Sequence, residues 1–164
     1  MKRPAILGIG LATLLLTLGY AIGGRWIGAA ASVALGCLWL AGLRRSWSGI
    51  DSLGLVGFTG MAAVGVWLAL AAPILLAGQV AALAAWDLDR FARRLRSAGR
   101  VEAESVLVRA HLQRLLAAAG LGLVFGGVAL AVQVPLSFGW ALLLAALVFL
   151  GLSRAIGWFN RAGD

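Results

Sequence analysis

Charged residues in this chain gather in a few short stretches, and long apolar runs separate them. Residues 4–24, 26–43, 52–86 and 115–153 contain no Asp, Glu, Lys or Arg. A transmembrane helix needs about 20 predominantly apolar residues to cross the hydrocarbon core of a bilayer. The pattern therefore predicts an all-α integral membrane protein, with residues 1–164 forming a single polytopic domain. Six spans are expected, over residues 5–22, 26–43, 53–71, 73–86, 115–133 and 137–153.

The stretch 53–86 is open to two interpretations, one helix or two. One helix would be about 51 Å long, far more than the roughly 30 Å of the hydrocarbon core. Two helices broken at Pro73 leave a second span of only about 21 Å. The basic residues favour two: with six spans, 13 of the 14 Lys and Arg residues share one side and Arg25 is the exception. Because Lys and Arg accumulate in cytoplasmic loops, we predict three in-out-in hairpins with both termini in the cytoplasm.

Residues 87–114 form the one sizeable polar segment between predicted spans and are expected on the cytoplasmic side. Three apolar residues recur there at helical spacing: Leu88, Phe91 and Leu95. This pattern is typical of a helix that lies on an anionic lipid surface, and we expect a short amphipathic helix over Asp87–Arg96. A second helix should begin near Val101 and run through His111 into the fifth span. The arginines expected to contact lipid headgroups are Arg90, Arg93, Arg94 and Arg96.

Composition indicates the cellular membrane in which the protein is expected. The chain is 62% hydrophobic and 12% charged, with a formal net charge of +8. Such basicity in a soluble protein would suggest nucleic acid, but in a membrane protein Lys and Arg set topology and contact headgroups. We therefore expect a bilayer with anionic headgroups, and no nucleic acid, as the partner. The strong excess of Arg over Lys is typical of GC-rich bacterial genomes, which predicts a bacterial inner (plasma) membrane. The single Cys37 excludes a disulfide framework.

The ionisable residues argue against several functions, because none falls inside a predicted span. Ionisable groups within the membrane usually mark proton relays, ion sites or substrate counter-ions. Their absence disfavours proton-coupled transport and intramembrane proteolysis, and no catalytic motif is found, so an enzyme is not expected. Asp87 and Asp89 lie on different helix faces and should pair with arginines rather than bind a metal. His111, the one histidine, is a weak candidate for a haem or chlorophyll ligand; we interpret it as interfacial and expect no cofactor.

Two functions remain. The first is a non-enzymatic integral membrane subunit, or assembly or scaffold factor, of a larger membrane complex, acting through helix packing and lipid contact. Its partners would be other membrane subunits or further copies of this chain. The alternative is a small channel, carrier or scramblase for a neutral or lipidic substrate. Its path would follow Thr59 and Gln79 beside the break at Pro73, within a glycine-rich stretch.

Overall fold

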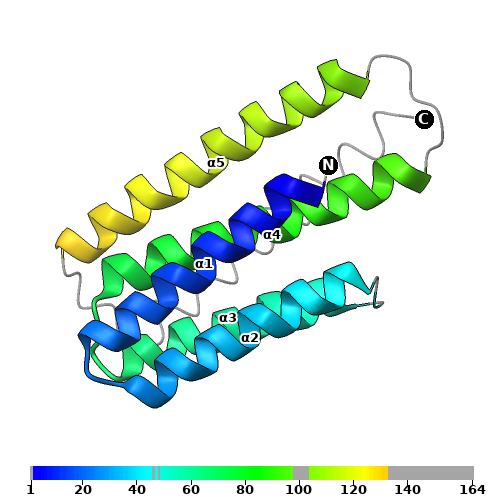
Figure 1. Ribbon diagram of the computed structural model, residues 1–164. Helices are drawn as coiled ribbons and strands as arrows, with labels where there is room; N and C mark the ends of the chain where they lie inside the picture. The colour runs from blue at the N-terminus through cyan, green and yellow to red at the C-terminus, as the bar shows by residue number, and fades with distance from the viewer. Residues whose placement is uncertain (1, 46, 48, 98–103, 133–164) are drawn as a thin grey trace. The chain divides into compact units, whose positions relative to one another are not determined.

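The computed structural model describes residues 2–45, 47, 49–97 and 104–132, with side chains from Pro4 onward except at residues 96, 97, 104 and 105. The described residues form helices α1 (Lys2–Ile22), α2 (Trp26–Arg44), α3 (Ile50–Trp67), α4 (Ala72–Ser97) and α5 (Glu104–Val132) (Figure 1). All of them except Val132 belong to the first of two units, Met1–Ala131 and Val132–Asp164. The sixth span predicted over 137–153 lies outside the described residues.

Four of these helices are long and apolar enough to cross a membrane: Pro4–Ile22 of α1, all of α2 and α3, and Val106–Val132 of α5. At 1.5 Å per residue, the 19 residues of α2 extend about 28 Å, close to the thickness of the hydrocarbon core. The architecture is therefore all-helical, as expected of an integral membrane protein.

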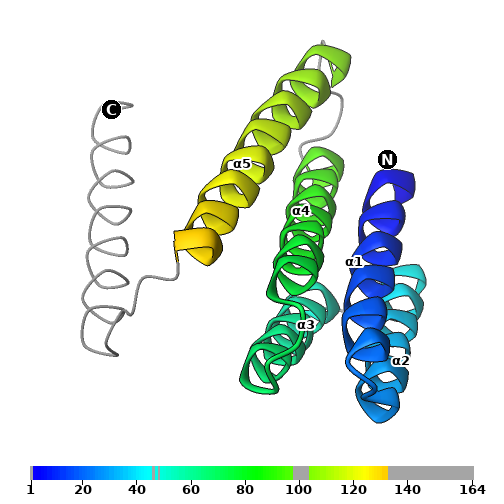
Figure 2. The same cartoon turned by 90° about the vertical axis from the view of Figure 1, so that its left-hand side faces the viewer.

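Helices α1 to α4 form an up-and-down bundle in which each helix packs against the next and α4 closes against α1 (Figure 2). Small residues let α1 and α4 approach closely. A Cβ atom built at Gly8 would lie 2.9 Å from the Cβ of Ala85, and Gly78 faces Leu16 across the same interface. Such small-residue contacts bring helix backbones together where lipid provides no hydrophobic drive for association.

The core of the bundle is aromatic on the side of α2 and α3. Trp39 and Phe58 are both buried and meet edge to face, with ring centroids 5.4 Å apart. Gly54 makes room for the Trp39 ring, because a Cβ atom there would overlap it. Trp39 therefore packs against the neighbouring helix α3. Trp67, by contrast, is the last residue of α3 and is 85% exposed.

The predicted break between the third and fourth helices is confirmed, although it lies a few residues earlier than the sequence indicated. Helix α3 ends at Trp67, and Pro73 is the second residue of α4, where a missing N–H costs no helical bond. The N–H of Leu70 donates to the carbonyl of Gly65, and that of Ala69 to Val66. This pair of bonds is a Schellman motif, which ends the helix and places Ala69 at φ +56°.

The prediction of a separate amphipathic helix over Asp87–Arg96 is wrong. Helix α4 runs from Ala72 to Ser97 without interruption and includes these residues. No glycine or proline stands between Trp86 and Ser97 to end the helix. The buried face of α4 also continues past the apolar half, through Asp89 to Ala92. The helix expected near Val101 is described from Glu104 and continues into the fifth span as α5.

Candidate functional site

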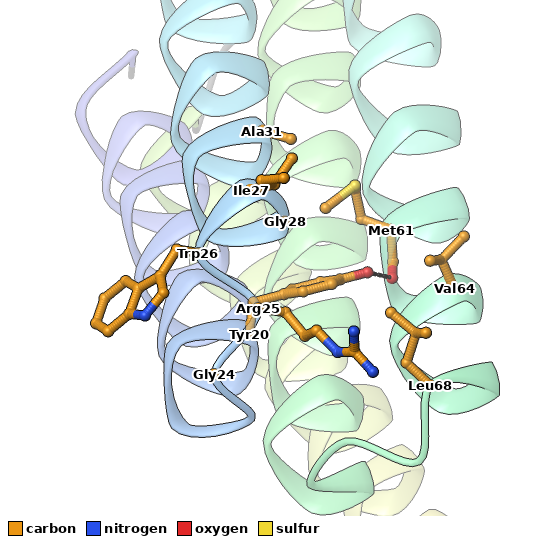
Figure 3. Close-up of a pocket in the computed structure, with 10 residues that line it drawn as sticks. All are labelled: Tyr20, Gly24, Arg25, Trp26, Ile27, Gly28, Ala31, Met61, Val64 and Leu68. Carbon is orange, nitrogen blue, oxygen red and sulfur yellow. Dashed lines mark hydrogen bonds between the residues drawn. The ribbon is translucent and has the colours of Figure 1, made fainter.

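The main candidate site is a groove between α2 and α3, at the end of the bundle that holds the α1–α2 turn (Figure 3). It encloses about 550 Å³, within the range of small-molecule and lipid pockets. Its walls are almost entirely apolar and come from Ile27, Ala31, Met61, Val64 and Leu68. Tyr20 lies across the inner end, and we call the site the Tyr20 groove.

Tyr20 fixes the shape of this groove. Its side chain is 1% exposed, and its hydroxyl donates a 2.6 Å hydrogen bond to the backbone carbonyl of Met61 on α3. Gly28 on α2 lies against the opposite part of the ring, where any side chain would collide with it. The ring therefore acts as a spacer between α2 and α3, and the two helices leave a hollow beyond it.

Arg25 stands at the mouth of the Tyr20 groove, in the turn that joins α1 to α2. This turn is another Schellman motif, with Gly24 at φ +69° and the N–H of Arg25 donating to the carbonyl of Tyr20. In Figure 3 the Arg25 side chain extends toward α3, whereas the Trp26 indole points away from the other lining residues. Among the described residues, the Arg25 side chain has no hydrogen bond or ion pair.

A second polar cluster lies at the opposite end of the bundle and is structural in character. Arg93 contacts Asp89 one turn earlier in α4, with Nε–Oδ2 and Nη2–Oδ2 distances of 2.8 and 2.6 Å. The same guanidinium lies 3.7 Å from Oδ1 of Asp51 in the first turn of α3. Both carboxylates are buried, so Arg93 compensates their charge and joins α3 to α4. The expectation that Asp89 pairs with an arginine is confirmed.

Two of the four arginines expected at lipid headgroups contact other side chains of this chain. Arg93 is engaged with the two carboxylates, and the Arg90 guanidinium lies 4.7 Å from the centroid of the Trp86 ring. Arg94 is exposed and also has an interaction partner, while the Arg96 side chain lies outside the described residues. Headgroup contact by these residues stays a prediction.

His111 joins α5 to α4. Its ring stacks on Phe91 with centroids 3.9 Å apart, and Nε2 lies 2.8 Å from Oδ2 of Asp87. This contact does not form a regular hydrogen bond. Asp87 thus contacts α5 while Asp89 is buried beside Arg93, which confirms that the two carboxylates occupy different faces of α4. Within the described residues, no group of three His, Cys, Asp or Glu side chains could hold a metal ion.

Thr59 and Gln79, the predicted transport path, are brought together. The Gln79 side-chain amide donates a 2.7 Å hydrogen bond to Thr59 Oγ1, whose hydroxyl donates to the Leu55 carbonyl. Both residues line a lateral hollow of about 420 Å³ between α3, α4 and α5, otherwise bordered by apolar side chains. The Gln79 carbonyl oxygen is buried and unpartnered among the described residues.

The sequence interpretation missed Tyr20 and gave Arg25 only a topological role. One signal was available, because Tyr20 is the single tyrosine of the chain and sits in an otherwise apolar run. Its partner, 41 residues away, could not be read from spacing. Comparisons with known protein families, with curated proteins and with solved structures give no match, so no family is assigned.

Proposed function

We propose that this protein is a non-enzymatic subunit or assembly factor of a larger membrane complex, and that it binds its partner through α5. The observation that carries this proposal is the contrast between α5 and the bundle. About a third of the most apolar window of α1 and of α2 is buried within the described part of the chain, but none of the window in α5 is. Leu121, Val124 and Phe125 are among its exposed large side chains.

The composition of α5 favours a protein partner over lipid alone. Within the described part of the chain, Gly120, Gly122 and Gly127 have no neighbouring atom within 4 Å of a built Cβ, so none of the other described helices covers these small residues. Small residues permit close helix–helix contact, whereas lipid chains gain nothing specific from them. A second copy of this chain and a different membrane subunit are both partners of this kind.

The charge pattern supports an orientation with the N-terminus in the cytoplasm. Among the described residues, Arg25 is the one charged side chain at its end of the bundle, while Arg44, Arg45 and the arginines of α4 lie at the end of the N-terminus. Because Arg is enriched on the cytoplasmic side of membrane proteins, we propose that this end faces the cytoplasm of a bacterial inner membrane. The cytoplasmic position of the C-terminus follows from the predicted sixth span.

Cross-linking in native membranes tests the proposal. In a Cys37→Ser background, a benzophenone probe attached to Val124→Cys on α5 should produce adducts with a second protein chain. Leu14→Cys on α1 is the matched control, because its parent side chain is similarly exposed (56% against 61%) but should meet lipid. Adducts at Val124 only with lipid or within the same chain, together with a monomer in mild detergent, would reject the proposal.

The lateral hollow favours a second candidate, a carrier or scramblase for a neutral or lipidic substrate. Its support is the unpartnered Gln79 oxygen, which could accept a hydrogen bond from a substrate. It ranks second because Gln79 and Thr59 are already bonded to each other and the rest of the lining is apolar. Reconstitution into liposomes distinguishes the two functions. Flux of a labelled lipid that exceeds the flux in protein-free vesicles and is lost on Gln79→Leu would favour this function over the first.

A further inference from the structure

The Tyr20 groove has apolar walls and one cationic side chain, that of Arg25, at its mouth. Ile27 and Val64 border it and are 89% and 47% exposed, so the groove opens sideways from the bundle as well as at its end. Both side chains belong to helices that are apolar enough to span a membrane. An open, apolar groove in such a position is surrounded by lipid chains, not by water.

The charge at the mouth has no counter-ion from the described helices. Residues 4–50 and 52–86 contain no Asp or Glu, and Asp51 belongs to the opposite end of the bundle. Helix α2 begins at Trp26, directly after Arg25, and no side chain caps its first turn. The free N–H groups of that turn add partial positive charge at the same end. The region is therefore complementary to an anion attached to an apolar tail.

We propose that the Tyr20 groove binds an anionic phospholipid, with one acyl chain between α2 and α3 and the phosphate on Arg25. Arginine matches phosphate oxygens geometrically, and a guanidinium at the membrane interface favours anionic lipids by about 1 kcal/mol, which corresponds to about a fivefold preference. The acyl chain fills the space that the Tyr20 ring keeps open between α2 and α3. This site is independent of α5 and of the protein partner proposed above.

Native mass spectrometry of the full chain tests the site. The protein is reconstituted in equal parts of phosphatidylglycerol and phosphatidylcholine, extracted in mild detergent, and the retained lipid is identified. Arg25→Gln should reduce retained phosphatidylglycerol about fivefold, whereas Arg44→Gln, the same change at the opposite end, should not. Ala31→Phe should also remove the lipid by filling the groove. Ala30→Phe is its control, because Ala30 is exposed and does not line the groove.

The outcomes separate the site from general charge attraction. Loss of phosphatidylglycerol in both Arg25→Gln and Ala31→Phe, with retention in both controls, establishes the site. Retention in either groove variant overturns the proposal, as does equal retention of the two lipids by the unmodified protein. A cross-linked protein segment in place of lipid, captured from a probe at Ala31→Cys, would equally overturn it. All four substitutions are at exposed positions, and a thermal unfolding curve for each variant shows whether it has folded.

Discussion

Replacing Ala69 by glycine should stabilise the protein, although it removes a methyl group. Ala69 occupies the left-handed position of the Schellman motif that ends α3, at φ +56°. A side chain in this conformation costs about 1–2 kcal/mol, which glycine does not incur. Glycine also makes the unfolded chain more flexible, which lowers the free energy of unfolding by about 0.4–1 kcal/mol. The net expectation is a gain of about 0.5–1 kcal/mol in the free energy of unfolding.

The chain provides two matched comparisons for this prediction. Gly24 holds the equivalent position at the end of α1, with φ +69° and open space around a built Cβ, so Gly24→Ala should lose about what Ala69→Gly gains. Ala63→Gly, inside α3, should lose about 1 kcal/mol. Unfolding in mixed micelles of increasing dodecyl sulfate content, followed by circular dichroism, gives all three values. Ala69→Gly and Ala63→Gly shifting the midpoint in the same direction would refute the reasoning.

Three further predictions concern side-chain contacts, each measured by the same unfolding assay. Tyr20→Phe should cost about 0.6–1.5 kcal/mol, since only one hydrogen bond is lost; no loss would mean that this bond is absent in the membrane. Arg93→Met should cost about 2–3 kcal/mol and more than Asp89→Asn, because it leaves buried carboxylates behind; the reverse order would contradict the ion cluster. His111→Gln should cost about 1 kcal/mol through the lost stacking on Phe91 and should change no visible absorbance; a band that disappears would indicate a bound cofactor.

Length and charge were enough to predict the helical class and the break near Pro73. A single helix over 53–86 is too long for a bilayer and divides the arginines unfavourably. The same rules failed where they assumed that a helix ends at the membrane surface. Helix α4 continues to Ser97 because local residues permit it and because Asp89 and Ala92 remain buried in the bundle.

The Tyr20 groove could not be predicted, because it depends on which faces of three helices meet. Periodicity is weak in α1 and α2, where nearly every residue is apolar, so the sequence marks no buried face. The contact from Tyr20 to Met61 and that from Asp51 to Arg93 each join residues about 40 positions apart. Only the local pair of Asp89 and Arg93, one turn apart on the same helix, was accessible to sequence reasoning.

Because α4 is one uninterrupted helix, a movement at one point along it also moves the rest of the helix. Its 26 residues extend about 39 Å, and they couple the close contact at Ala85 and Gly8 to the cationic segment beyond Trp86. A straight helix bends little without proline or glycine pairs, so a tilt at one contact is transmitted along its length. Ala85, which packs on Gly8, lies about 12 Å from Arg93 along the helix, so a tilt of about 10° that starts there would still move Arg93 by about 2 Å. A bulkier residue at Gly8 should therefore also disturb the contact between Arg93 and Asp51.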